Sequence, residues 1–133
     1  MKPIVFENGF FLPNDGSGRL LAGEMRVEAG RIAYLGKAKK IKGEIRVDLK
    51  GQLVIPGFVQ THVHLCQTLF RNLADDLQLL DWLKLRIWPM EGAHTLTSLH
   101  ASARLGIAEL LAGGTTTILD MGTVRHTDAI FEA

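Results

Sequence analysis

The first 56 residues carry short apolar runs in which hydrophobic and polar positions alternate, as in half-solvated β-strands. Ile4–Phe6 and Phe10–Leu12 flank Glu7-Asn8-Gly9, and we predict a hairpin there because an Asn-Gly pair tolerates the positive φ of a tight turn. A loop rich in glycine and small polar residues follows at 13–18. The other strands predicted in this part are 25–28 and 31–35, joined by a turn at Ala29-Gly30, then 45–49 and 53–55.

The pattern changes after Pro56-Gly57. Phe58–Thr61 is a short, mostly apolar run, typical of a strand that is buried on both faces. Thr115–Leu119 is rich in β-branched residues and predicts a second strand, which ends at Asp120. Between and after these strands we predict three helices: one over 77–87 that is broken at Pro89, one from Thr95 or Thr97 to Gly113-Gly114, and one that starts at Thr127-Asp128.

Strands separated by helices indicate a parallel sheet with right-handed crossovers. Two such strands cannot form a stable sheet with both faces covered, and residues 127–133 predict the start of a helix. We therefore interpret the fold class as α/β and expect the chain to be the N-terminal piece of a longer architecture. Its two parts are predicted at 1–56 and 57–133.

Composition narrows the class of protein. Of the 133 residues, 47% are hydrophobic and 22% charged, with a net charge of +1, which excludes a disordered polar tail and argues against nucleic acid as the main partner. We expect a solvated loop for the basic run at 37–42. No run approaches the roughly 18 apolar residues of a membrane span, and no signal peptide follows Met1. The lone cysteine, Cys66, cannot form an internal disulfide and favours a reduced, cytoplasmic location.

A pair of histidines follows the first strand of the second part. His62 and His64 are separated by one residue, and side chains two apart on a strand point to the same face, so both imidazoles can reach one metal ion. Neutral imidazole suits zinc, iron(II), nickel and copper. An isolated His-x-His is often a structural pair. In parallel α/β folds, however, ligands bind beyond the carboxyl ends of the strands, where this pair lies, and that position favours a metal site.

The surroundings of the pair carry a family resemblance. Residues 51–64 strongly resemble the signature that opens the barrel of the amidohydrolase superfamily. Residues 67–76 and 80–83 resemble, within it, the subgroup that holds methylthioadenosine/S-adenosylhomocysteine deaminases, 5′-deoxyadenosine deaminases and triazine chlorohydrolases. Gly114-Thr115-Thr116-Thr117 matches as well. The resemblance covers essentially the whole chain.

The resemblance implies the start of a metal-dependent (β/α)8 TIM barrel at 57–133, preceded by part of a small β-sandwich at 1–56. His62 and His64 match the first two metal ligands of the family, with zinc as the expected divalent metal and iron as the alternative. The metal of the family activates water, which attacks an aromatic ring carbon and expels ammonia or chloride. The other ligands and the catalytic groups would lie beyond Ala133, so we expect no catalytic residue within this chain.

Two residues are candidates for binding substrate. Glu91 matches the position at which nucleoside-deaminase relatives place a glutamate that holds the ribose hydroxyls, and an ionised carboxylate only accepts hydrogen bonds, which suits a diol. A surface glutamate at a helix end is the alternative interpretation. Gln67 matches a glutamine near the substrate in chlorohydrolase relatives, although a role in supporting its loop is slightly favoured. Trp88 can stack on a ring, but a core position is favoured.

Other polar residues have simpler structural interpretations. Cys66 continues the spacing of His62 and His64 and can be a third ligand, but a buried thiol is favoured. Asp120 is interpreted as a structural hydrogen-bonding group. The remaining residues are His94, His100 and His126, which we interpret as structural or surface histidines, and Asp75 and Asp76, which would complement a helix N-terminus.

The function predicted first is hydrolytic deamination of a small heteroaromatic substrate, with an adenosine-type nucleoside favoured. A chlorohydrolase or a guanine-type deaminase of the same superfamily is an alternative. From another class, the chain alone can be an inactive module that self-associates through the strand edge at 115–119, because open edges pair with other chains. We expect a homo-oligomer or self-association, and no nucleic-acid or membrane partner.

Overall fold

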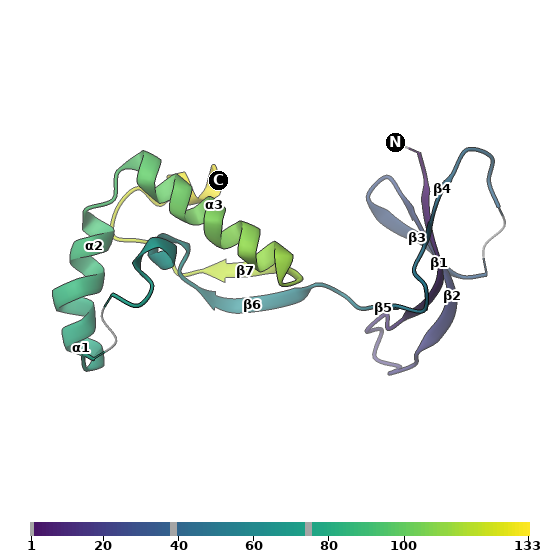
Figure 1. Cartoon of the computed structure of the whole chain (residues 1–133), viewed down its shortest axis with the longest axis horizontal. Coiled ribbons are helices and arrows are strands. Elements are labelled where there is room, and N and C mark those ends of the chain that lie inside the picture. Colours follow the sequence, from purple (N-terminus) through teal and green to yellow (C-terminus); the bar gives the residue numbers. More distant parts are fainter. Residues whose placement is uncertain (1, 38–39, 74–75) are drawn as a thin grey trace. The chain divides into compact units, whose positions relative to one another are not determined.

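The computed structural model describes residues 2–37, 40–73 and 76–133, and the chain forms two compact units, Met1–Pro56 and Gly57–Ala133 (Figure 1). Each unit contains its own sheet. Asp75 and two residues of the basic run at 37–42 lie outside the described residues. Within the described ranges, no helix combines the length and the hydropathy that a membrane crossing requires.

The first unit is a five-stranded mixed sheet. Its strands are β1 (Ile4–Phe11), β2 (Leu21–Glu28), β3 (Arg31–Gly36), β4 (Ile45–Asp48) and β5 (Leu53–Val54). The order is β3-β2-β1-β4, and β5 also pairs with β1. β1 is antiparallel to β2 and parallel to β4 and β5, so it forms the centre of the sheet.

The hairpin predicted at Glu7-Asn8-Gly9 is wrong, because β1 continues through these residues. Glu7 and Asn8 together oppose a single residue of β2, which is a β-bulge. The bulge accommodates the positive φ of Asn8, 55°, without reversing the chain, and the Asn8 amide donates to Asp48 at 3.1 Å. The second predicted hairpin is confirmed: β2 and β3 are joined at Ala29-Gly30, where both φ angles are positive.

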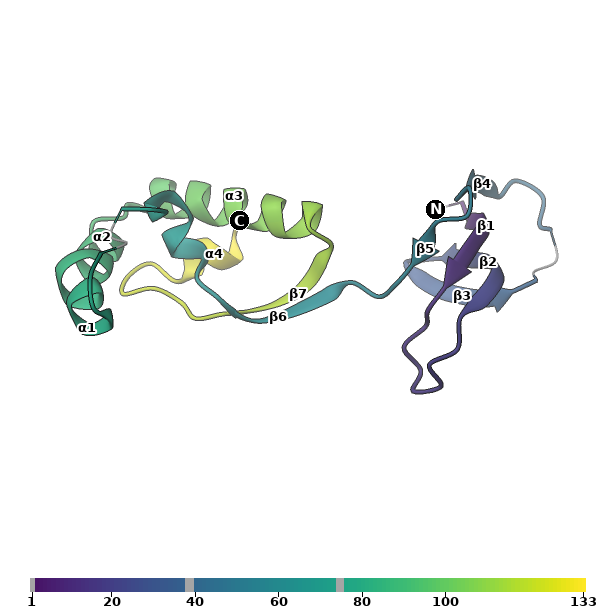
Figure 2. The same cartoon turned by 60° about the horizontal axis from the view of Figure 1, so that its bottom comes forward.

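The second unit places two parallel strands beneath a long helix. β6 (Phe58–Val63) pairs in parallel with β7 (Thr115–Asp120), which confirms the predicted parallel sheet. The helix α3 (Leu96–Ala112) lies along this pair in both views (Figures 1 and 2). The prediction that the first strand is buried on both faces is wrong for this chain. Phe58 and Val59 are 52% and 64% exposed, because α3 and one neighbouring strand leave much of β6 uncovered.

The first predicted helix is longer than expected. It consists of α1 (Leu79–Trp82), a π-helical turn η2 (Leu83–Ile87) and α2 (Trp88–Gly92), and it does not break at Pro89. The wider π turn shifts the hydrogen-bond pattern just before the proline, which has no N–H to donate. Trp88 is 46% exposed, so its predicted core position is also wrong.

The other helices agree with the predicted signals. Thr95 caps α3, and Ser98 completes a reciprocal capping box. Gly114, with a φ of 85°, follows the end of that helix, as a positive-φ terminus predicts. A short helix α4 (Asp128–Phe131) begins where the third helix was predicted, and a 3-10 helix η1 (Leu65–Phe70) follows β6.

The core of the second unit lies between η1, α3 and α4. Its buried apolar residues are Leu65, Cys66, Leu99, Ala103, Ala129 and Ile130. Gly106 allows η1 to approach α3 closely, since a Cβ at this position would lie 2.7 Å from the Thr68 hydroxyl and 2.9 Å from a Leu65 methyl group. This packing fixes η1 just beyond the end of β6, where the candidate site lies.

Candidate functional site

The two histidines converge at the carboxyl end of β6. His62 is the penultimate residue of the strand and His64 immediately follows it, and their Nε2 atoms lie 3.1 Å apart. The rings are tilted by 58°, with centroids 5.0 Å apart. Two imidazole nitrogens bound to one tetrahedral zinc ion are separated by about 3.3 Å, because each Zn–N bond is about 2.05 Å long. The donor set and its spacing therefore fit one metal ion.

Glu91 brings a carboxylate to the same region from another element. It lies on α2 and is only 6% exposed. Its Oε1 accepts hydrogen bonds from the Gln67 amide at 2.9 Å and from the Cys66 thiol at 3.4 Å. The structure thus places the two predicted substrate-binding residues, Gln67 and Glu91, in direct contact. The alternative of a surface glutamate does not fit the burial of Glu91.

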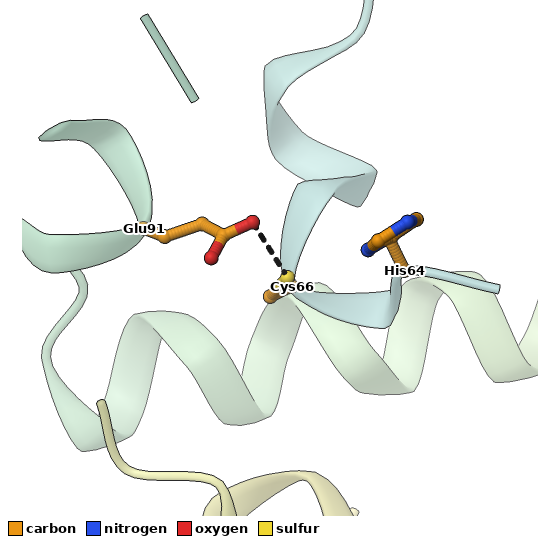
Figure 3. A group of neighbouring side chains, drawn as sticks. All are labelled: His64, Cys66 and Glu91. Atoms are coloured by element: carbon orange, nitrogen blue, oxygen red, sulfur yellow. Dashed lines mark hydrogen bonds between the residues drawn. The ribbon is translucent and has the colours of Figure 1, made fainter. Parts of the chain in front are cut away.

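Cys66 lies between His64 and Glu91 (Figure 3), and its side chain is fully buried. The thiol contacts two acceptors, Glu91 Oε1 and the Gly122 carbonyl, the latter at 3.2 Å. Burial, followed by the negative charge of Glu91, raises the pKa of the thiol to about 12. A thiol that remains protonated at neutral pH behaves as a hydrogen-bond donor, and only a thiolate is a good metal ligand.

The same three residues also meet a geometric test for metal ligation. One donor atom each from His64, Cys66 and Glu91 lies within 4.8 Å of the others. The Cys66 thiol donates a hydrogen bond to the Glu91 carboxylate, as the dashed line in Figure 3 shows. The histidine pair, whose nitrogens are closer, is therefore the better-formed donor set.

Backbone contacts hold the turn that carries these side chains. Asp120, at the end of β7, accepts from the backbone N–H of Leu65 and of Gly122, both at 2.8 Å, which agrees with its structural interpretation. The His94 ring contacts the Cys66 carbonyl at 2.9 Å and the Ser98 hydroxyl at 2.8 Å, so it too has a structural role. His100 contacts the Glu132 carbonyl and is half-buried.

A cavity of about 520 Å³ borders the site, and residues of α3 form part of its wall. His64 and Gln67 contribute to its wall, together with Trp82 from α1 and Ile87 from η2. The sequence singled out neither Trp82 nor the contact between Cys66 and Glu91. The two residues of that contact are 25 positions apart, and no local pattern relates the turn after β6 to α2.

The model of the amidohydrolase family matches residues 53–133, which include every residue of this site. The chain belongs to the amidohydrolase family. It is 42% identical over 125 residues to a 5-methylthioadenosine/S-adenosylhomocysteine deaminase of Symbiobacterium thermophilum, an alignment that covers 91% of this chain and 29% of that protein. The chain thus spans about three tenths of the length of the curated relatives that it matches.

Solved amidohydrolase structures show the same fold. An adenosine deaminase from Xanthomonas campestris with bound zinc superposes with a TM-score of 0.74 at 26% identity, over 96% of this chain and 30% of that one. An atrazine chlorohydrolase from Arthrobacter aurescens complexed with zinc gives a TM-score of 0.81 at 22% identity, over 97% and 32%. The second likeness shows the fold alone. In both superpositions the mixed α/β chain covers about a third of the solved amidohydrolase chain.

Proposed function

We propose that this chain is the N-terminal portion of a metal-dependent amidohydrolase that hydrolytically deaminates an aminated heteroaromatic ring, with an adenosine-type nucleoside as substrate. The observation that carries the proposal is the convergence of His62 and His64, with 3.1 Å between their Nε2 atoms, beside the buried carboxylate of Glu91. The 42% identity to a 5-methylthioadenosine/S-adenosylhomocysteine deaminase supports hydrolytic deamination as the class of reaction. In this proposal 1–56 belongs to a composite β-sandwich and 57–133 opens a (β/α)8 barrel.

His62 and His64 would hold the metal, with zinc proposed first and iron second. Zinc is bound in the adenosine deaminase that resembles this chain. Bound zinc makes water nucleophilic near neutral pH, which is the chemistry that a hydrolytic deamination requires. Two imidazoles leave a catalytic zinc site short of ligands, so the remaining ligands and the catalytic groups are proposed beyond Ala133.

Glu91 would accept hydrogen bonds from the two ribose hydroxyls of the nucleoside. Its carboxylate is nearly buried, and in the described part of the chain no hydrogen bond reaches its second oxygen, Oε2. An ionised carboxylate only accepts hydrogen bonds, and a vicinal diol offers two donors. Gln67 contacts Glu91 directly, so it would act on the substrate through that residue.

The proposed metal site is tested by removing one imidazole at a time. We expect His62→Ala and His64→Ala each to lower the zinc content of the purified protein at least tenfold, because each removes one of the two imidazole ligands. Zinc content is measured by mass spectrometry after dialysis against trace zinc. The matched control is His100→Ala, which removes a half-buried histidine of α3 that lies outside the site. Undiminished zinc in both site variants would contradict the assignment.

Two alternatives lead to different measurements. A chlorohydrolase or guanine-type deaminase of the same fold would release chloride from a chlorotriazine or ammonia from guanine, and the likeness to the atrazine chlorohydrolase is one of fold only. The other alternative is an inactive module that self-associates.

The proposed cytoplasmic location is supported by a single cysteine that is reduced and buried.

A further inference from the structure

We infer that Gln67 and Cys66 are positioning residues that hold one oxygen of Glu91 and direct the other toward the hydroxyls of the substrate. The inference rests on the proposed function, in which Glu91 binds the ribose diol. It extends the proposed function, because recognition of the diol then depends on three side chains, Gln67, Cys66 and Glu91, and not on Glu91 alone.

The two hydrogen bonds converge on a single atom. Gln67 donates through Nε2 at 2.9 Å and Cys66 through its thiol at 3.4 Å, and both reach Glu91 Oε1. The thiol shares its one proton with the Gly122 carbonyl at 3.2 Å, so Gln67 is the stronger of the two donors. Figure 3 shows Glu91 extending from α2 toward Cys66, with His64 on the other side of the thiol. With Oε1 held by two donors, the orientation of the carboxylate plane is restricted, and Oε2 is the oxygen that remains for a ligand.

Both donors to Glu91, the amide of Gln67 and the thiol of Cys66, are neutral, so they leave the negative charge of its carboxylate available to a ligand. Among the described residues, no lysine or arginine forms an ion pair with Glu91. A cation would neutralise the carboxylate, whereas an amide and a thiol orient it and leave its charge available. Hydrogen bonds to a charged acceptor are stronger than those between neutral groups, so a charged Oε2 binds a hydroxyl more tightly.

The positions of both donors are themselves fixed. They follow one another on η1, whose first turn is held by Ser102 from α3, since its hydroxyl donates to the Leu65 carbonyl at 2.8 Å. The ring of His94 contacts the next carbonyl, that of Cys66, at 2.9 Å. These contacts make η1 a rigid base, so the amide of Gln67 approaches Glu91 from one direction.

Binding to the metal-free protein tests the inference, because no turnover then interferes. Adenosine carries the ribose diol and 2′,3′-dideoxyadenosine lacks it, and calorimetry gives the Kd of each. We expect the wild type to bind adenosine more tightly. Gln67→Met preserves the size of the side chain but removes the donor, and it should weaken adenosine binding about tenfold, with less than a twofold change for the dideoxy analogue.

Two further variants keep the test decisive. Gln67→Glu places a second carboxylate beside Glu91 and should weaken adenosine binding more than Gln67→Met does, again selectively. Cys66→Ser retains a donor and should bind adenosine within about threefold of wild type, whereas Cys66→Ala should bind it less well. Gln52→Met, at an exposed position of the first unit, is the matched control for the substitution itself.

Each outcome has a defined meaning. Equal weakening of both ligands by the Gln67 variants, or no weakening, would overturn the inference while the diol preference of the wild type upholds the role of Glu91. A wild type without any diol preference would contradict that role and the inference together. A thiolate-to-metal absorption band in the cobalt-loaded wild type that Cys66→Ser abolishes would identify Cys66 as a metal ligand and overturn its positioning role.

Discussion

Cys66 has the most constrained chemistry of any side chain in the site. It is fully buried, and its single proton is shared between two acceptors, the Gly122 carbonyl and the Glu91 carboxylate. A thiol in this setting resists ionisation, in contrast to reactive cysteines, which lie near cations or helix N-termini. At the scale of single residues, Cys66 therefore contributes a hydrogen-bond donor.

Alkylation tests this behaviour directly. Burial and the neighbouring carboxylate raise the pKa of Cys66 to about 12, so the thiolate that reacts with iodoacetamide is scarce at pH 9. We expect the folded, metal-free protein to react at least 100-fold more slowly at pH 9 than the same protein in urea, where a cysteine titrates near pH 8.5. Mass spectrometry follows the modification. Rapid labelling of the folded protein at pH 9 would show that the thiol is accessible and ionised.

Local patterns in the sequence were sufficient to predict where some residues of the site lie. The spacing of His62 and His64 after an apolar strand predicted their convergence, because strand geometry alone brings such side chains to one face. The contact of Gln67 and Cys66 with Glu91 was not predictable in this way. It depends on how α2 returns to η1, which is decided by packing between segments about 25 positions apart.

At the scale of elements, the packing of η1 against α3 determines where the site residues lie. Gly106 is buried where the two elements meet, and a Cβ there would lie 2.7 Å from the Thr68 hydroxyl and 2.9 Å from a Leu65 methyl group. Both neighbours belong to η1, the element that also carries Cys66 and Gln67. Any side chain at 106 must therefore displace the turn that forms the site.

Gly106→Ala should destabilise the second unit even though alanine is the better helix former. Overpacking costs about 1–3 kcal/mol, against a gain in helix propensity of about 1 kcal/mol. We expect a net loss of about 1 kcal/mol in the free energy of unfolding, measured by urea titration. Ala101→Gly at an exposed position of α3 is the control and should lose about 1 kcal/mol through propensity alone. A stabilised Gly106→Ala protein would contradict the tight packing.

Elements were predictable where the signal was local and less so where it was not. The turn at Ala29-Gly30 and the start of α3 at Thr95 each depend on residues within four positions; the turn was predicted, and Thr95 was one of the two N-caps proposed for the helix. The bulge in β1 was mistaken for a turn because its Asn-Gly pair has the same positive-φ preference in either setting. The parallel partners β4 and β5, about 40 residues away, pair with β1 on either side of the bulge, and no local pattern reveals them.

At the scale of the whole molecule, the chain covers 29% of the length of a deaminase to which it is 42% identical. Large apolar side chains on the β6–β7 pair remain exposed: Phe58 by 52%, Val59 by 64% and Leu119 by 58%. In an amidohydrolase barrel the strands form a closed ring, in which every strand has two neighbours. The exposed strand surface is consistent with a portion of such a barrel.

The 133-residue chain alone should therefore self-associate. Exposed apolar side chains and open strand edges pair with other copies. We expect size-exclusion chromatography with light scattering to give a mass above 14.6 kDa that rises with concentration. Leu119→Lys, which places a charge on the exposed surface of β7, should reduce the association. A well-folded monomer at all concentrations would contradict this expectation.

The deamination itself provides the most direct test of the proposed function. The full-length protein of which this chain is the proposed N-terminal portion is loaded with zinc and incubated with adenosine or 5′-methylthioadenosine, and ammonia is measured by a coupled enzymatic assay. We predict one ammonia per nucleoside consumed, with the activity lost in His64→Ala and after chelation of the metal. A zinc-loaded protein that releases no ammonia from any nucleoside, or that releases it equally well with His64 replaced, would contradict the account.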